Sequence, residues 1–190
     1  MTDNENIDNQ AIQQKQILQA LRKFQDGYKK RDLSNIDGFM DLFLQSDEIE
    51  LIGIGASMRG ANEWFQGVEA VKSIIGGDWE YWGDVILDVE GAKISLLGDV
   101  AWLSTTGSIE QTGTHDKALP FYLEQMKDIL VDEENHDDTK LLEATHFGMR
   151  RLRERLKGMG HHWPFVFTAV LIYSQNTWRF HTIHWSMPVD

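Results

Sequence analysis

The sequence predicts a single α+β domain, because its hydrophobic pattern changes period along the chain. Apolar residues recur at three- and four-residue steps between residues 17 and 44, which is typical of amphipathic helices. From residue 79 onward they alternate at a period of two, which predicts strands. A second helical stretch interrupts those strands at about residues 115–160. We therefore expect residues 1–190 to form one domain: three N-terminal helices, an antiparallel sheet and an inserted helical hairpin.

Three helices are predicted ahead of the sheet. The first should end near Asp32, and Ser34 is placed to cap the second. The alternating, isoleucine-rich run "EIELIGIG" predicts a strand at about residues 48–54. The third helix covers "QGVEAVKSIIGG", and the glycine pair at its end predicts that it stops there.

The later segments predict a meander of antiparallel strands. One strand should start near Trp79 and carry Tyr81, with short strands in "KISLLGD" and "VAWLSTTGSIEQTG". The last two, "FVFTAVLIYS" and "WRFHTIHWSM", are joined by the tight turn "SQNT". The inserted hairpin has one apolar stripe on each helix, and its second helix ends in "RRLRERLK", which we interpret as a solvated face.

Composition excludes several classes of function. A net charge of −12 disfavours a nucleic-acid partner or an anionic membrane surface, since both require clustered Lys and Arg. The chain has no cysteine, so it can hold neither disulfides nor thiolate-based zinc sites. No apolar run approaches the roughly 20 residues of a membrane span, and the polar N-terminus is not a secretory signal. We expect a cytoplasmic protein.

Short motifs recur in a fixed order along the chain. The segment "KKRDLSNIDGFMDLF" lies between the first two predicted helices, and it is followed by Gly98, Asp99, Val100, Ala101 and Trp102, then by Trp178, His184, Ser186 and Pro188. In this order they resemble the SnoaL-like branch of the nuclear transport factor 2 and ketosteroid isomerase superfamily, over residues 11–114 and 163–188. The resemblance implies a cone, in which helices cover the concave side of a bent sheet and leave a pocket. It also implies that the convex side forms a homodimer, for which Trp102 and its neighbours supply an apolar surface.

The resemblance does not carry a known activity over to this chain. In ketosteroid isomerase the tyrosine oxyanion donor stands eight positions before the Asp that ends the first helix, and here that position is Phe24. The stretch that would hold the Asp base reads "LIGIG", without an ionisable group. Isomerisation by that route is therefore not predicted, and function has to be argued from the site.

The last strand supplies the main site candidates. A similar "W…H-x-S" segment in the association domain of calcium/calmodulin-dependent kinase places the residue between His and Ser in the pocket, which implies that Trp185 faces inward. Strict alternation then puts Ile183 and His181 on the concave side, and His184 on the convex side, where a structural role is expected. His181 is the candidate catalytic residue, because an imidazole can act as acid or base near neutral pH.

Further ligand contacts are expected from aromatic side chains around the cone. They are Phe24 and Tyr28 on the first helix, and Trp64, Trp79 and Tyr81 near the third. No histidine pair has the spacing of a metal site, so neither a metal nor a cofactor is expected.

The sequence thus predicts a protein that binds a small, largely apolar molecule and forms a homodimer. An isomerase or lyase that uses His181 for acid–base chemistry stays open as an alternative, as does an oligomerisation module without a ligand. We expect the hairpin to cover the rim of the cone, because its apolar stripes must be buried there or against a neighbouring subunit.

Overall fold

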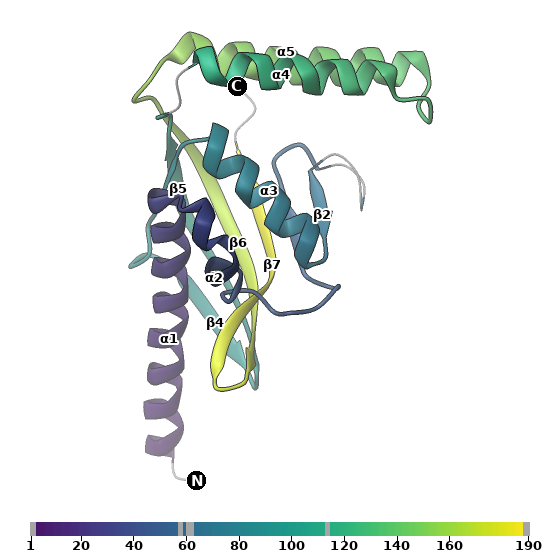
Figure 1. The fold of residues 1–190 in the computed structure, drawn as a ribbon. Helices are drawn as coiled ribbons and strands as arrows, with labels where there is room; N and C mark the ends of the chain where they lie inside the picture. Colours follow the sequence, from purple (N-terminus) through teal and green to yellow (C-terminus); the bar gives the residue numbers. More distant parts are fainter. Residues whose placement is uncertain (1–2, 57–58, 60–62, 113–114, 188–190) are drawn as a thin grey trace.

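The computed structural model describes residues 3–56, 59, 63–112 and 115–187, and Figure 1 shows the arrangement of its elements. The helical elements are α1 (Asp3–Lys30), the 3-10 helix η1 (Leu33–Asn35), α2 (Ile36–Met40), α3 (Val68–Tyr81), α4 (His115–Val131) and α5 (Asp137–Lys157). The strands are β1 (Glu50–Ile52), β2 (Trp64–Gln66), β3 (Asp84–Leu87), β4 (Lys93–Leu97), β5 (Val100–Glu110), β6 (His162–Ser174) and β7 (Thr177–Ser186). The predicted α+β fold, with N-terminal helices and an inserted hairpin, is confirmed.

The strands form one curved, unclosed sheet in the order β2-β1-β7-β6-β5-β3, and β4 also pairs with β5. Its centre is the long antiparallel pair β5–β6, which runs in register from Val100 opposite Ile172 to Glu110 opposite His162. The sheet is mixed rather than wholly antiparallel, because β1 pairs with β7 in parallel. None of the helices in the described ranges combines the length and apolar character that a membrane crossing requires.

The core lies between α1 and the concave face of the sheet. Ile17, Leu21, Phe24 and Tyr28 form the buried stripe of α1, and each has no exposed surface. The Phe24 ring lies 5.4–5.9 Å from the rings of three residues on the sheet, Phe167, Phe180 and Trp185. This aromatic contact fixes α1 against β6 and β7.

Helix α3 is longer than predicted and continues through the glycine pair at 76 and 77 to Tyr81. Ile75 and Trp79, four residues apart, are both buried and keep the helical period across the glycines. A glycine inside a helix costs only about 1 kcal/mol relative to alanine, whereas burying a large apolar side chain stabilises by roughly 1.5–3 kcal/mol. Trp79 and Tyr81 therefore belong to a helix, and the prediction that they start a strand is wrong.

The turn before α2 also differs from the expectation. Asp32, rather than Ser34, is the capping residue, and its carboxylate accepts hydrogen bonds from the Ser34 amide and hydroxyl. The residue that precedes α2 is Asn35. The 3-10 helix η1 and helix α2 nevertheless each begin within two residues of the start predicted for the second helix.

A β-bulge changes the phase of β7. It lies between Phe180 and Thr182 and leaves His181 as the extra residue opposite β6. Before the bulge, Trp178 and Phe180 are buried, and after it Trp185 is buried with them in the same core. Strict alternation from Trp185 would put Trp178 and Phe180 on the convex face together with His184, and the burial of both residues shows that the alternation does not extend past the bulge. The prediction that Trp185 faces inward agrees with its burial.

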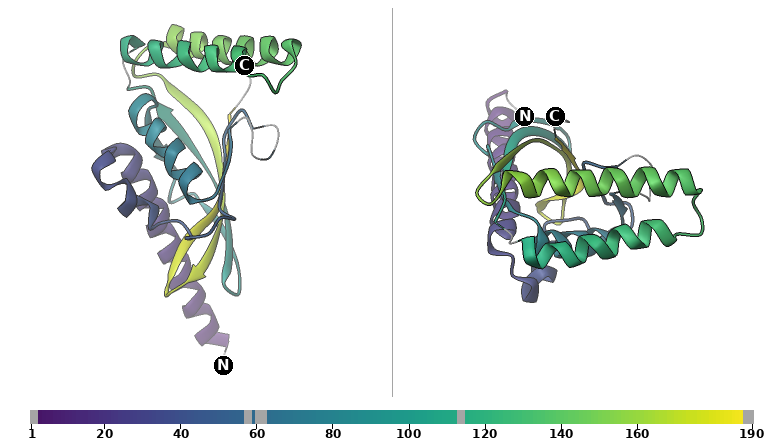
Figure 2. Two further views of the ribbon diagram at one scale, coloured as in Figure 1. Left: turned by 45° about the vertical axis from the view of Figure 1, so that its right-hand side comes forward. Right: turned by 90° about the horizontal axis from the view of Figure 1, so that it is seen from above.

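Helices α4 and α5 lie side by side across the open end of the cone (Figures 1 and 2). They pack together through Tyr122 against Phe147, whose ring centroids are 6.1 Å apart, and through Met126 against Gly148. Their contact with the cone is made by Phe121, which stacks on Tyr81 of α3 at 4.3 Å. The hairpin is therefore well packed within itself and more lightly attached to the sheet domain.

Candidate functional site

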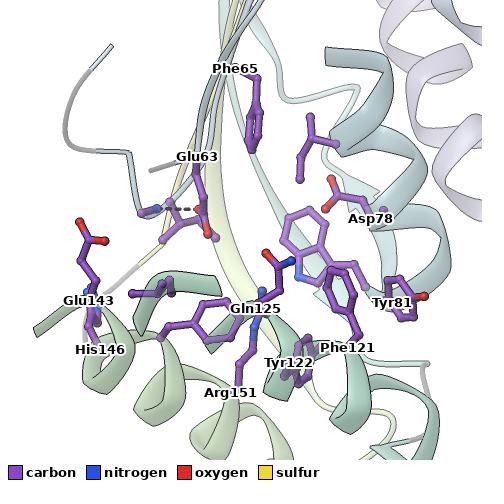
Figure 3. Close-up of a pocket in the computed structure, with 18 of the residues that line it drawn as sticks. Glu63, Phe65, Asp78, Tyr81, Phe121, Tyr122, Gln125, Glu143, His146 and Arg151 are labelled. Carbon is purple, nitrogen blue, oxygen red and sulfur yellow. Dashed lines mark hydrogen bonds between the residues drawn. The ribbon is translucent and has the colours of Figure 1, made fainter. Parts of the chain in front are cut away.

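A cavity of about 650 Å³ lies between the open end of the cone and the hairpin (Figure 3). Three sets of residues line it. The cone contributes Leu51, Gly53, Ile54, Gly55, Glu63, Phe65 and Trp185, and the α3 segment contributes Ile74, Gly77, Asp78, Tyr81 and Trp82. The hairpin contributes Phe121, Tyr122, Gln125, Ile129, Leu142, Glu143, His146, Phe147 and Arg151. The hairpin thus supplies one complete wall.

Aromatic rings form the floor and one side of the cavity. Trp185 is only 2% exposed, and its ring lies 4.9 Å from Phe165 and 5.0 Å from Phe167. Trp82 meets Trp185 edge-on at 5.6 Å. These rings are held from behind by the core, so the floor is rigid, apolar and suited to a flat or cyclic ligand.

Asp78 brings a carboxylate to this apolar surface. It stands one helical turn after Ile74 and three residues before Tyr81, and these three residues share the cavity-facing side of α3. The buried Tyr28 hydroxyl donates a hydrogen bond to the Asp78 carboxylate across 2.9 Å. Burial, and then the charge and hydrogen bond of Asp78, raise the pKa of Tyr28 well above its ordinary value. Tyr28 therefore stays protonated and keeps its proton directed at the carboxylate of Asp78, which holds that carboxylate in position.

A second carboxylate, that of Glu63, faces the cavity from the β1–β2 connection (Figure 3). It accepts a hydrogen bond from the Gly55 amide at 2.7 Å, and the Glu63 carbonyl accepts one from the Gly53 amide at 2.7 Å. Its backbone has a φ of +66°, a left-handed conformation that is uncommon outside glycine. Two short hydrogen bonds hold this conformation and fix Glu63 relative to Gly53 and Gly55 at the cavity rim.

The hairpin wall carries one arginine, Arg151, together with one glutamate and one histidine. The guanidinium carbon of Arg151 lies 4.6 Å from the Tyr122 ring centroid and 5.1 Å from that of Phe147, which is cation–π geometry. Glu143 and His146 stand one turn apart on α5 and also line the cavity. The site therefore combines an aromatic floor with carboxylates from the cone and both charge types from the hairpin.

Of the predicted ligand contacts, Trp185 and Tyr81 line the cavity. Phe24, Tyr28, Ile183 and Trp79 are buried in the core, and Tyr28 reaches the site only through Asp78. Trp64 is not among the cavity-lining residues; its indole nitrogen donates a hydrogen bond to Glu50 at 3.3 Å.

His181, the predicted catalytic residue, is not among the residues that line this cavity. It is the extra residue of the β7 bulge, and its Nδ1 lies 2.8 Å from the Thr182 hydroxyl oxygen. His184 is exposed rather than buried. Among the described residues, no cluster of three or more His, Asp or Glu side chains is placed to hold a metal ion. The acid–base groups of the cavity are instead Asp78, Glu63, Glu143 and His146.

The sequence analysis missed Asp78 and the whole hairpin wall. Positions 74, 77, 78 and 81 fall on one face only if the helix continues past the glycine pair, so the predicted stop concealed the carboxylate. The helical period of the hairpin is visible in the sequence, because Phe121, Gln125 and Ile129 follow at four-residue steps and so share one helix face. Which face would meet the cone depends on tertiary packing, which the local pattern does not contain.

Comparisons with known proteins identify the fold. No family model matches the chain, and no curated protein sequence matches it. Solved structures do match over nearly the whole length. A protein from Novosphingobium aromaticivorans, described as NTF2-like with a cystatin-like fold, is 9% identical and covers 98% of this chain and 89% of its own, with a TM-score of 0.59.

Two other matching structures are described as candidate dehydratases. One is a candidate scytalone dehydratase from Novosphingobium aromaticivorans, which is 8% identical, covers 96% of this chain and 89% of its own, and has a TM-score of 0.59. The other, of the NTF2-like family and from Streptomyces avermitilis, is 12% identical, covers 93% and 96%, and has a TM-score of 0.58. At these identities the likeness shows the fold alone, and this fold is the NTF2-like cone that the sequence motifs predicted.

Proposed function

We propose that this NTF2-like chain binds a small, largely apolar molecule, with a ring system, in the cavity between the cone and the hairpin. The observation that carries the proposal is the cavity of about 650 Å³ with an aromatic floor, which falls within the roughly 300–1,000 Å³ of typical ligand pockets. The rings of Trp82, Trp185, Tyr81 and Phe121 offer apolar contact, while Asp78 and Arg151 offer polar contacts to substituents. An oligomerisation module without a ligand has no need of such a cavity.

Mass spectrometry of small molecules released from the purified protein tests this proposal. Gly77 lines the cavity, and nothing lies within 4 Å of the position that its Cβ would take. Gly77→Leu should therefore project four carbons into the cavity and narrow it, and Gly77→Ala is the matched control. We expect a compound that is enriched with the wild type and Gly77→Ala but not with Gly77→Leu. Identical sets of compounds from all three proteins would refute the proposal.

A second candidate function is acid–base catalysis of an isomerase or lyase type on the same ligand. It is favoured by the Tyr28–Asp78 hydrogen bond, which holds a carboxylate in position beside an apolar surface. The two candidate dehydratases that share the fold support this class of reaction. Asp78 is the proposed proton acceptor, and His146 on the opposite wall is the proposed proton donor.

Once a bound compound is identified, the catalytic proposal predicts that the wild type converts it. Asp78→Asn keeps the shape of the side chain and removes its basicity, so turnover should fall by a factor of about 100 or more. Binding of the compound should change much less. If Asp78→Asn turns the compound over at the wild-type rate, Asp78 is not the proton acceptor.

We also propose that the convex face of the sheet forms a homodimer contact. Trp102 is 49% exposed there, and Val100 and Val166 are 40% and 45% exposed. Apolar side chains grouped on one face of a sheet usually mark an interface. Trp102→Glu should lower the molar mass measured by sedimentation, and an unchanged mass would exclude this contact.

A further inference from the structure

The hairpin has a second apolar surface that the cavity does not use. We define the outer hairpin face as the seven residues Leu119, Leu123 and Leu130 of α4 with Leu141, Met149, Leu152 and Leu156 of α5. Their exposed fractions range from 41% for Leu119 to 85% for Leu156. None of the seven lines the cavity.

The spacing of these residues places them on one side of the hairpin. On α4 they stand four and seven residues apart, and on α5 they follow at intervals of eight, three and four, which is the repeat of a single helix face. The cavity is lined by a different set on each helix, namely 121, 122, 125 and 129, and 142, 143, 146, 147 and 151. In projection around each helix the centres of the two sets are separated by more than a quarter turn, and on one side the α4–α5 contact lies between them.

The outer hairpin face therefore points away from the cone, and the views in Figures 1 and 2 show no described element packed beyond the two helices. Its footprint is about 20 Å by 25 Å, from helix diameters of about 10 Å and a rise of about 1.5 Å per residue. The accessible surface over such a footprint is comparable with the roughly 800 Å² that each partner buries in a standard protein interface.

The charges of the hairpin are separated along its length. The connecting loop and the start of α5 carry Asp132, Glu133, Glu134, Asp137 and Asp138, which form the acidic end. The last two turns of α5 read "RRLRERLK" and form the basic end, with Arg153 and Lys157 at exposed positions. The 21 residues of α5 hold these two ends about 30 Å apart.

We propose that the outer hairpin face binds the same face of a second copy of this chain, with the two hairpins antiparallel across a two-fold axis. The acidic end of each hairpin then meets the basic end of the other, while the seven apolar residues of each copy form a four-helix core. A membrane surface is a poorer match, since the acidic end would face anionic lipid. Packing of the second hairpin on the outer hairpin face would also restrict the movement of α4 and α5, which form one wall of the cavity.

Sedimentation velocity at micromolar concentration tests the apolar part of this interface. Leu152→Glu puts a charge at the centre of the outer hairpin face and should lower the molar mass relative to the wild type. In the Trp102→Glu background, which removes the convex-face contact, it should lower the mass from that of a dimer to that of a monomer. Ile12→Glu is the matched control, because Ile12 is also an exposed apolar residue on a helix, 58% exposed, and lies on α1 far from the hairpin. Its mass should equal that of the wild type.

A charge-swap experiment tests the antiparallel arrangement. The double variant Glu133→Lys, Glu134→Lys removes most of the net charge of the acidic end, and the double variant Arg153→Glu, Lys157→Glu removes the net charge of the basic end. Each variant alone should associate at least tenfold more weakly than the wild type at low salt, while an equimolar mixture should form a mixed dimer. The mixture should lose this advantage at high salt, because exposed charges are screened.

Four results would overturn the proposal. They are a wild type that sediments as a monomer throughout, a Leu152→Glu variant of unchanged mass, a mixture that associates no better than its components, and a monomer that binds phosphatidylcholine–phosphatidylglycerol vesicles through Leu152.

Discussion

At Tyr28, one buried hydroxyl connects the core to the cavity. The ring is fully buried among Phe24, Phe39 and Trp185, while the hydroxyl reaches Asp78 at the cavity surface. Replacing both partners of such a bond by apolar groups costs little, but leaving one partner unpaired costs more. Removing only the Tyr28 hydroxyl or only the Asp78 carboxylate should therefore cost more stability than replacing both by apolar groups.

The raised pKa of Tyr28 makes stability depend on alkaline pH. The folded protein holds this proton above the ordinary tyrosine pKa of about 10, whereas the unfolded chain releases it there. The stability from this group is complete below about pH 10 and is lost as the pH rises through the folded value. Tyr28→Phe should reduce the free energy of unfolding by about 1 kcal/mol at neutral pH.

Urea denaturation between neutral pH and about pH 11 measures this effect. The wild type should lose stability above about pH 10 more steeply than Tyr28→Phe, so that the difference between them shrinks. Parallel curves for the two proteins over that range would contradict the assignment of the shift to Tyr28.

The role predicted for His181 depends on whether β7 alternates regularly or contains a bulge at this residue. As the extra residue of a bulge, it bonds to Thr182 and is absent from the cavity lining. His181→Ala should therefore change the affinity for a cavity ligand less than twofold, whereas His146→Ala should change it more. Fluorescence titration of both variants decides between them, and a large loss in His181→Ala alone would restore the original interpretation.

At the scale of elements, periodicity predicted which segments are helices and strands, but it failed where tertiary packing changed the phase. The glycine pair in α3 carries a local stop signal, yet burial of Trp79 extends the helix past it. The bulge in β7 has no signature in "WRFHTIHWSMP" that distinguishes it from regular alternation. These two shifts changed the predicted site, because the longer α3 brought Asp78 into it and the bulge in β7 left His181 outside it.

The hairpin is the element on which ligand binding depends most. It supplies nine of the cavity-lining residues, while Glu110 and His162 at its base are paired neighbours in the sheet. Replacing residues 113–160 by a short glycine-rich turn should thus keep the β5–β6 ladder and remove one cavity wall. We expect a folded protein by circular dichroism with at least tenfold weaker binding of an apolar probe. Unchanged affinity would show that the hairpin is not part of the site.

At the scale of the whole molecule, the cone was predictable because it depends on the order and period of its elements and on motifs distributed along the chain. The cavity was not, because it forms where α3, β1, β7 and the hairpin meet, and these segments are distant in sequence. Trp185 and Tyr81 were identified because large aromatic residues near the cone opening serve either the core or a ligand. Which of the two roles each ring takes depends on packing.

Variants of Gly77 test directly whether the cavity is open to a ligand. Gly77→Ala reduces the conformational freedom of the unfolded chain at a position that is helical in the folded protein. It should therefore raise the free energy of unfolding by about 0.5–1 kcal/mol, while leaving the cavity almost unchanged. Gly77→Leu should fold equally well but narrow the cavity beside the aromatic floor.

The decisive measurement is a fluorescence titration of the three proteins with the apolar probe anilinonaphthalene sulfonate. The account predicts saturable binding by the wild type and Gly77→Ala with affinities within twofold of each other, and at least tenfold weaker binding by Gly77→Leu. Equal binding by a folded Gly77→Leu protein would contradict it.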